Sequence, residues 1–485
     1  MRISSRVALS IAAAIVVLGT VSILIRSGEP REPWNVLLIV PDTVRGDHVS
    51  INGYARETTP VFDQLAREGT NFTQAITVAP RTWQSYSSII TGLYPPRHGV
   101  RCIYDHPLEP DLPTLGTILK ERGYATATFD GNAFLAQMTG CAGFDACLRA
   151  DTARAQATRR HEEEVLVDQI IEWIDSNKEP FFGFVRLSGG HWPYVENAWT
   201  ETFESCEGQD HAFNEGSQGL LFEELGRGLV LGDPQAHRNT FFPPPLAEPT
   251  LRHVIAHYDA KLRFGDALIG RLIEHLRTSG KLERTIVVVT SDHGESFGEH
   301  GYRQHGPRLD EPVMRVPLLI RLPEKHSPYN PGGANHQLVR IVDIFPTLLD
   351  VLRLPIPSAV DGVSLLPAIA GKSLPALWAY GESGRDFVGI DPERFFPGVK
   401  GKQRMVRTTD WKLVRVARPE GPAYRLFDLE DDPGETRNVA AEYPDKVTEL
   451  AKLLDPFLKL DERANEERAL SDTEREHLRQ LGYLN

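Results

Sequence analysis

Short, unbroken apolar runs recur along the first two thirds of the chain. They occupy residues 35–41, 125–129, 181–187, 285–291 and 316–321. Runs of this length without alternation are typical of strands whose two faces are both buried. Segments with the apolar spacing of helices separate them, for example at 114–122 and 251–278. The alternation predicts an α/β fold, in which a mostly parallel sheet is sandwiched by helices.

The pattern changes at about residue 371, where turns rich in Pro and Gly begin. Short alternating runs follow at 403–408, 411–416 and 424–428, and a helical pattern occupies 444–459. Alternation with a period of two predicts a small antiparallel sheet that is covered on one face. We therefore expect a main domain at 33–370, a C-terminal α+β subdomain at 371–460 and a charged helical tail at 461–485.

The first 32 residues have the pattern of an export signal or a membrane anchor. Arg2 and Arg6 precede a nearly continuous apolar run at 7–25, which is long enough to cross a bilayer as one helix. Small residues suited to signal cleavage are sparse, so we favour an uncleaved anchor over a cleaved signal. Because basic residues before a span stay on the cytoplasmic side, we expect a single-pass membrane protein with its catalytic domain in the periplasm or outside the cell.

Charge and cysteine content narrow the classes of function. The formal net charge of -13 makes nucleic-acid binding improbable, because phosphate backbones are held by clustered Lys and Arg. The four cysteines are Cys102, Cys141, Cys147 and Cys206, and an oxidising compartment would allow disulfides among them. Cys141 and Cys147 flank a short loop that contains Gly, so we favour this pair, with free buried thiols as the alternative.

Two of the predicted strands end directly on acidic residues. Asp42 follows the first strand, and Asp292 with His293 follows the strand at 285–291. Ligands gather at the carboxyl ends of the strands in sheets of this kind. Carboxylate oxygens and an imidazole nitrogen are suitable ligands for one divalent metal ion. The alternative for Asp292 and His293 alone is a helix cap beside a surface histidine.

Thr82 begins a segment that has the pattern of a turn entering a helix. The exposed N–H groups at a helix start attract anions such as phosphate or sulfate. A hydroxyl is a poor nucleophile at its ordinary pKa, but contact with a divalent cation activates it. We therefore predict that Thr82 is both a metal ligand and the nucleophile. The alternative is a helix-capping threonine.

Two loop histidines are candidates for binding the substrate anion or protonating the leaving group. His191 follows the strand at 181–187, and His305 lies between Asp292 and the next predicted strand. His300 competes with His305 for this role, and spacing does not separate them. We rank His191 and His305 first.

With these residues in place, the chain resembles the sulfatase family of the alkaline phosphatase superfamily from about residue 35 to 450. The matching segments are 40–48, 59–72, 82–100, 115–124, 191–194, 291–295, 361–365, 410–413 and 426–438. The resemblance implies a mixed sheet sandwiched by helices and an antiparallel C-terminal subdomain. It also implies an ester-cleaving enzyme that depends on a metal ion.

The departures from the family pattern bear on the substrate. Typical sulfatases carry a Cys or Ser that matures to formylglycine where this chain has Thr82, which cannot undergo that maturation. The family's Arg falls on Tyr86, and its active-site Lys falls on Asn132, so we predict that these two residues line the substrate site. An imidazole, His293, replaces a metal-ligating amide. The resulting N/O ligand set favours Mn or Zn over Ca as the single ion.

The leading hypothesis is a hydrolase, or a transferase, that cleaves a phosphate- or sulfate-type ester with Thr82 as nucleophile. Its metal ligands would be Asp42, Thr82, Asp292 and His293. The alternatives are a formylglycine-independent sulfuric ester hydrolase and a catalytically silent protein that binds anions. The expected partner is an anionic ester, with a glycan or a lipid head group as its alcohol part. The sequence indicates neither that alcohol nor the oligomeric state.

Overall fold

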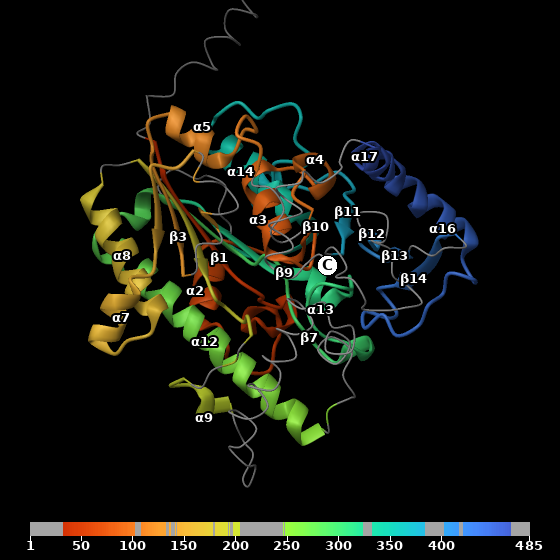
Figure 1. The fold of residues 1–485 in the computed structure, drawn as a ribbon, viewed down its shortest axis with the longest axis horizontal. Helices are drawn as coiled ribbons and strands as arrows, with labels where there is room; N and C mark the ends of the chain where they lie inside the picture. Colours follow the sequence, from red (N-terminus) through yellow and green to blue (C-terminus); the bar gives the residue numbers. More distant parts are fainter. Residues whose placement is uncertain are drawn as a thin grey trace, which may run out of the picture. The chain divides into compact units, whose positions relative to one another are not determined.

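The described part of the chain contains two larger β-sheets, of eight and four strands, and a two-stranded one in the computed structural model (Figure 1). The structure describes residues 33–101, 108–131, 135–136, 141, 143–177, 180–192, 194, 197–203, 246, 248–323, 332–383, 402–416 and 421–466. The predicted anchor at 7–25, Cys102, Asn132, Cys206 and most of the predicted tail lie outside these residues. Within the described ranges, no helix has the length and apolar character needed to span a membrane.

The larger sheet has eight strands, and all but one of them run in the same direction. Its order is β10 (Gly333–Arg340), β2 (Thr70–Ile76), β9 (Arg315–Arg321), β6 (Thr285–Thr290), β1 (Asn35–Pro41), β5 (Phe181–Leu187), β3 (Ala125–Asp130) and β4 (Ala146–Arg149). Only β9 is antiparallel to its neighbours, β6 and β2. The sheet is therefore mixed and mostly parallel, as predicted.

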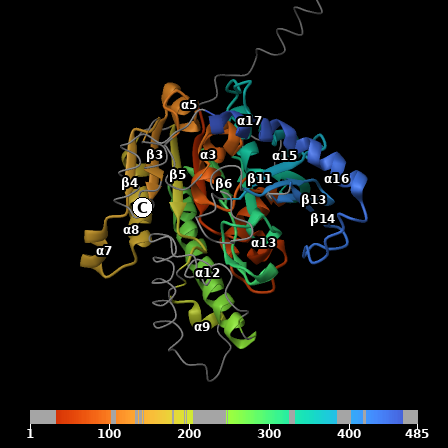
Figure 2. The ribbon, with the colours of Figure 1, turned by 45° about the vertical axis from the view of Figure 1, so that its right-hand side comes forward.

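Helices cover both faces of this sheet (Figure 2). On one face lie α2 (Pro60–Glu68), α8 (Glu162–Ser176) and α12 (Glu248–Thr278), whose apolar side chains share one core with β1 and β5. On the other lie α3 (Thr82–Thr91) and α5 (Leu115–Glu121), and α14 (Ile344–Val351) packs on α3. Alternation along β5 explains the division, because Phe184 contacts Tyr86 of α3 whereas Val185 joins the α12 core.

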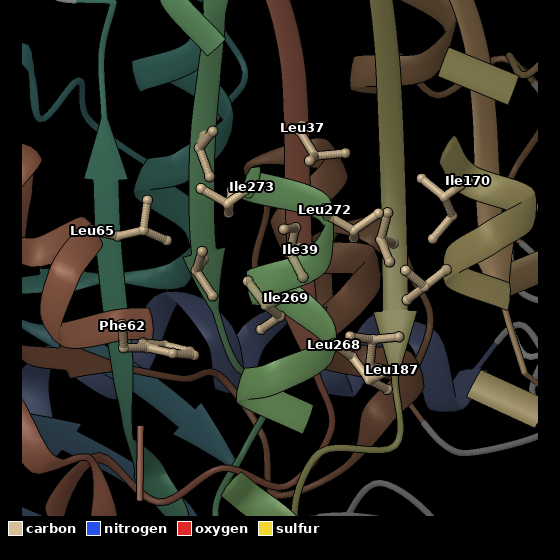
Figure 3. Packing of buried hydrophobic residues seen from close by; sticks show 14 of the residues in the cluster. Leu37, Ile39, Phe62, Leu65, Ile170, Leu187, Leu268, Ile269, Leu272 and Ile273 are labelled. Atoms are coloured by element: carbon tan, nitrogen blue, oxygen red, sulfur yellow. The ribbon is translucent and has the colours of Figure 1, made fainter. Parts of the chain in front are cut away.

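The long helix α12 buries a stripe of apolar residues against the middle of the sheet (Figure 3). Ile269, Leu272 and Ile273 face Leu37 and Ile39 of β1. The spacing of three and four residues places them on one side of the helix. Each fully buried side chain of this kind contributes about 1.5–3 kcal/mol as an upper bound. This packing holds β1, and with it Asp42, at the centre of the fold.

A second sheet of four antiparallel strands follows. Its order is β11 (Ala379–Glu382), β12 (Arg404–Arg407), β13 (Trp411–Val416) and β14 (Ala423–Asp428). It is followed by α16 (Pro444–Ala451) and α17 (Asp455–Glu466). The N–H of Glu382 donates to the carbonyl of Val78, 2.9 Å away, so β11 is joined to the loop that leads into α3. The antiparallel sheet confirms the prediction for this region, and the domain boundary at 370 stays a prediction.

Several short elements connect these parts. They are α4 (Pro95–His98), α7 (Thr152–Thr158), α9 (Thr200–Phe203), α13 (Glu311–Met314), α15 (Leu366–Ile369), β7 (Ser296–Phe297) and β8 (Arg303–Gln304). Cys141 and Cys147 form a disulfide, as predicted, with their Cα atoms 6.1 Å apart. This bond ties the start of β4 to the loop before it.

Candidate active site

The strand order brings the two predicted acidic strand ends together. β1 and β6 are parallel neighbours, with Ile39 in register with Val289. Asp42 directly follows β1, and Asp292 and His293 follow β6. Ligand atoms of these three side chains all lie within 4.8 Å of one another, and all three residues are fully buried. The sheet topology thus assembles three of the four predicted metal ligands.

Two atoms of this cluster are buried without a hydrogen-bond partner. They are Oδ2 of Asp292 and Nε2 of His293. Nδ1 of His293 lies 3.0 Å from the carbonyl of Gly294, which can only accept, so the proton is assigned to Nδ1 and Nε2 presents a lone pair. Nε2 faces Oδ2 of Asp292 at 3.4 Å and Oδ1 of Asp42 at 3.7 Å. Three lone-pair donors that converge in a buried space fit a cation.

The two carboxylates of the cluster have opposite electrostatic surroundings. Burial opposes the ionisation of Asp42, but Arg186, His191 and His293 together hold its pKa well below the usual range. Arg186 donates to Oδ2 of Asp42 and also pairs with Asp130 at 3.0 Å. Burial and the negative charge of Asp42 raise the pKa of Asp292 well above its usual range. A cation beside Asp292 would offset both of these penalties.

Thr43 links the two carboxylates to each other. Its hydroxyl donates to Oδ1 of Asp42 at 2.6 Å, and its N–H donates to Oδ1 of Asp292 at 3.0 Å. The residue has a φ of 61°, a conformation that is rare and strained for a β-branched side chain. Strain of this kind persists where the surroundings over-determine it, often at functional sites. This role of Thr43 was not predicted from the sequence.

Thr82 is the first residue of α3, and Arg81 is the N-cap residue of that helix. The Arg81 side chain makes no capping bond, and among the described residues no hydrogen bond engages the hydroxyl of Thr82. The hydroxyl of Thr77 connects α3 to the metal-ligand cluster, because it donates to the carbonyl of Asp292 at 2.5 Å and lies 3.0 Å from Oγ of Ser85. Thr82 therefore begins a helix that is joined to Asp292 through Thr77.

Arg81 brings a positive charge to the same region. Its guanidinium lies against the α-carbon of Gly306, where any Cβ would collide with it. Its charge contributes to the lowered pKa values of both His293 and His305. Arg81 was not predicted as a site residue, although a basic residue directly before a predicted nucleophile is a recognisable sequence signal.

The histidines at 191, 293 and 305 form one cluster. The ring centre of His305 lies 4.3 Å from that of His293 and 5.2 Å from that of His191. Burial lowers the pKa of each of the three, that of His293 to about 4. All three imidazoles are therefore neutral at pH 7. The structure thus brings both predicted substrate histidines to the metal-ligand cluster, whereas His300 lies in the separate cluster of buried charges with Asp310 and Glu435.

A buried carboxyl group supports His305. Oε1 of Glu295 lies 3.1 Å from Nδ1 of His305, and its Oε2 accepts a hydrogen bond of 3.0 Å from the hydroxyl of Tyr194. Burial raises the pKa of Glu295 to about 8, so this carboxyl carries a proton at neutral pH. Glu295 can then donate to Nδ1, which leaves the proton of the neutral imidazole on Nε2.

The family resemblance predicted that Tyr86 and Asn132 line the substrate site, and the structure describes only Tyr86. Tyr86 is fully buried on α3, and its hydroxyl donates to the carbonyl of Val40 at 2.6 Å. Its proton is thus used by the main chain of β1. Asn132 lies outside the described residues. Arg186, the one polar residue of the otherwise apolar strand β5, is a second cation that was not predicted from the sequence.

Residues 34–354 match the family model "Sulfatase", and residues 298–462 match "N-sulphoglucosamine sulphohydrolase, C-terminal". The chain belongs to the sulfatase family. Arylsulfatase K of Xenopus laevis is 27% identical to this sulfatase over 467 residues, which cover 88% of this chain and 82% of that protein. An arylsulfatase of Clostridium perfringens is 26% identical, with 87% of this chain and 93% of that protein covered. The protein is therefore a sulfatase-like hydrolase of ester bonds.

Solved structures share the fold of this sulfatase. The phosphonate monoester hydrolase of Agrobacterium radiobacter has a TM-score of 0.71 and 24% identity, with 91% of this chain and 99% of that chain covered. A protein solved in complex with its substrate D-glucosamine-2-N,6-O-disulfate has a TM-score of 0.66 and 22% identity, with 89% and 99% covered. At these identities the likeness shows the fold alone.

Proposed function

We propose that this sulfatase is a divalent-metal-dependent hydrolase that cleaves a sulfate- or phosphate-type ester with Thr82 as its nucleophile. The observation that carries the proposal is the pair of unpartnered, buried atoms, Oδ2 of Asp292 and Nε2 of His293, beside Asp42. The relatives support both ester types, because they include arylsulfatases and phosphonate monoester hydrolases.

The metal ion would be held by Asp42, Asp292 and His293, with the hydroxyl of Thr82 as the fourth ligand. A bound ion would supply Lewis acidity, which lowers the pKa of a hydroxyl and stabilises negative charge on the substrate. One imidazole among carboxylate oxygens favours Mn or Zn over Ca. Arg186 leaves one oxygen of Asp42 for the ion, because it donates to Oδ2 whereas Oδ1 faces His293.

The reaction is a double displacement at sulfur or phosphorus. Oγ of Thr82 gives up its proton and bonds to the central atom while the bond to the ester oxygen breaks, and the leaving oxygen takes up one proton to become the alcohol. The oxygen of a water molecule then bonds to the same central atom while the bond to Oγ breaks. One proton of the water returns to Oγ, which restores the Thr82 hydroxyl, and the other leaves with the sulfate or phosphate. A second alcohol in place of water would make the same site a transferase.

Residues around Thr82 can bind the anion and move the proton. Arg81 supplies a positive charge near His293 and His305, which compensates for the cation missing at Tyr86. His191 would bind an oxygen of the anion, but its Nδ1 faces the carbonyl of Trp192 at 2.5 Å, which can only accept, so it would donate to the anion only after gaining a proton at Nε2. His305 protonates the leaving alcohol through Nε2 and recovers a proton at Nδ1 from Glu295, 3.1 Å away.

We also propose that the catalytic domain lies outside the cytoplasmic membrane on an N-terminal anchor. The support is the apolar run at 7–25 after two arginines, which would place the rest of the chain in the periplasm or outside the cell. An anionic glycan ester is the substrate class that we favour, because one structural neighbour was solved with a disulfated glucosamine.

The proposal is tested with the purified chain and Mn, Zn or Ca supplied one at a time. Rates are compared for matched aryl sulfate, phosphate and phosphonate monoesters. Thr82→Ala is expected to abolish turnover, and mass spectrometry of the wild type quenched during turnover should find the substrate group on Thr82. Thr448→Ala is the control, since this threonine bonds only within the exposed helix α16. Undiminished turnover by Thr82→Ala would rule out the mechanism.

One alternative keeps its own support. The likeness to arylsulfatases over most of the chain favours a sulfuric ester hydrolase that works without formylglycine. A kcat/KM for the aryl sulfate well above that for the matched phosphate would decide for it. If no divalent ion binds the chain at micromolar concentration, a catalytically silent anion-binding protein becomes the better description.

A further inference from the structure

A pocket of about 750 Å³ opens beside the candidate active site, at the carboxyl ends of β3 and β5. Two of the residues that line the pocket also contact residues of the candidate active site. Arg186 donates to Asp42, and Nζ of Lys261 on α12 donates to the carbonyl of His191. The opposite wall is formed by residues 155, 156 and 159–163, at the end of α7, the turn after it and the start of α8. A substrate whose ester lies at Thr82 can therefore extend its alcohol part into this pocket.

The lining of this pocket is rich in positive charge, although the chain as a whole is acidic. It includes Arg159, Arg160, Arg186 and Lys261 against two carboxylates, Glu162 and Glu163. Most of these charges are already compensated. Arg160 pairs with Asp168 at 2.5 Å, Arg186 pairs with Asp42 and Asp130, and Glu163 accepts from the hydroxyl of Ser188 at 2.7 Å. Glu162 begins α8, where it complements the positive end of the helix.

Arg159 is the remaining cation. Among the described residues it makes no side-chain hydrogen bond or ion pair, and it is exposed at the pocket mouth. It ends α7 with a φ of 52°, in the left-handed region where glycine or asparagine is usual. An arginine held there is less favourable than glycine, because its Cβ crowds the backbone.

The rest of the wall suits a sugar ring. Phe264 of α12 and His161 meet edge to face, with ring centres 5.0 Å apart, and both line the pocket. Asn197 and Ser188 add an amide and a hydroxyl to the lining. Aromatic walls with a few polar groups are typical of sites that bind small organic molecules.

We propose that this pocket binds a second anionic group on the alcohol part of the ester, a carboxylate or a sulfate, and that Arg159 determines this specificity. The inference rests on the proposed function, because it concerns the alcohol that the reaction releases. The substrate would thus be an acidic sugar that carries at least two negative groups, of which only the one at Thr82 is cleaved.

Three substrates test the proposal. They are sulfate esters of one sugar that differ at a single carbon, which carries a neutral hydroxymethyl, a carboxylate or a second sulfate. The wild type is expected to show a kcat/KM at least about tenfold higher for one or both anionic sugars, as a charge-assisted hydrogen bond would give. Whichever sugar shows the larger advantage identifies the second anion.

Variants of Arg159 then assign the effect. Arg159→Gln and Arg159→Gly should reduce the anionic advantage by about tenfold, mainly through KM, and Arg159→Lys should keep part of it. Glycine fits the left-handed backbone, so Arg159→Gly guards against misfolding. Arg154→Gln is the matched control, since Arg154 lies on the same helix, pairs with Glu172 and is absent from the pocket lining.

The outcomes separate the two proposals. Equal rates of the wild type on all three sugars, or an Arg159→Gln variant that slows all three equally, would overturn the pocket assignment and leave the proposed function standing. Turnover that survives Thr82→Ala would overturn the mechanism instead, whatever Arg159 does. A higher kcat/KM for the anionic sugars that is lost only in the Arg159 variants supports both the pocket assignment and the proposed function.

Discussion

Nε2 of His293 faces Oδ2 of Asp292 across 3.4 Å in the buried centre of the molecule, and neither atom has a hydrogen-bond partner. A buried polar atom without a partner costs about 1–3 kcal/mol. Two such atoms that face each other are therefore an unfavourable arrangement for the chain alone. The same pair becomes favourable when a cation lies between them.

Asp292→Asn should have opposite effects on the metal-free and the metal-loaded chain. Without metal, the variant removes a carboxyl group whose ionisation is opposed by burial and by the charge of Asp42, so thermal unfolding in EDTA should occur at a higher temperature than for the wild type. With Mn or Zn, calorimetry should show affinity reduced by at least about tenfold. Asp431→Asn, on an exposed turn, serves as the control. A variant that is less stable in EDTA but binds metal normally would contradict the assignment.

Thr43 offers a test of stored strain. Thr43→Val keeps the β-branched shape at φ 61° but loses the hydrogen bond to Asp42, whereas Thr43→Gly loses the same bond and relieves the strain. We expect the glycine variant to be more stable than the valine variant by about 1–2 kcal/mol. Urea denaturation measures the difference, and a more stable valine variant would show that the backbone is not strained.

The pair of Glu295 and His305 predicts a limb in the pH–rate profile. Burial raises the pKa of Glu295 to about 8, so its proton is present below that pH and lost above it. Hydrolysis of an alkyl ester, which needs a protonated leaving group, should therefore decline above about pH 8, and that of an aryl ester should decline less. Glu295→Gln should be slower and lack this limb. An unchanged limb in Glu295→Gln would assign the proton elsewhere.

Glu382 predicts how the fold responds to acid. It is fully buried, and although burial opposes its ionisation, Arg101, Lys402 and Arg404 hold its pKa well below the usual range. A depressed folded-state pKa gives stability that is present above the unfolded pKa of about 4.3 and is lost as the pH falls below it.

Glu382→Gln should consequently lose about 3–5 kcal/mol at neutral pH, because three buried cations lose their partner. Its unfolding free energy should also depend less on pH below about 4.3 than that of the wild type. The exposed Glu449→Gln on α16 is the comparison. Parallel acid-unfolding curves for Glu382→Gln and the wild type would contradict the role of this carboxylate.

Gly306 and Gly421 make a matched pair for testing Arg81. Both have left-handed backbones, with φ values of 123° and 122°, but only a Cβ at Gly306 would collide with the Arg81 guanidinium. Alanine at either position should cost similar stability. Only Gly306→Ala should lower kcat/KM, by about tenfold or more, because it displaces a charge near Thr82. Equal activity of the two variants would remove Arg81 from the anion site.

Much of the sheet follows from the sequence because its strands are buried on both faces. The runs at Asn35–Pro41 and Phe181–Leu187 are observed with the predicted bounds. Strands β2 and β10 were not predicted, since both carry polar residues within short alternating patterns. The antiparallel direction of β9 depends on the path of the chain after β6 and has no signature within its own residues.

The residues of the site that directly follow a buried strand could be predicted from the sequence. Asp42, Asp292 and His293 follow two strands that prove to be neighbours, whereas the register of β3, β1 and β5 that places Arg186 between Asp130 and Asp42 is a long-range property. The strain at Thr43 likewise depends on two residues about 250 positions apart. The roles of Thr82, His191 and His305 stay predictions until the variants are measured.

The pairing of distant charges also sets the order of events during synthesis. The partner of Asp42, Arg186, is synthesised 144 residues after it. The partner of Arg101, Glu382, is synthesised 281 residues after Arg101. At a synthesis rate of roughly 5–20 residues per second, Arg101 therefore lacks this partner for about 14–56 s. The nascent chain must spend that time with its charged groups in water. A ribosome that stops before Glu382 therefore releases a fragment that lacks the contacts needed to finish folding.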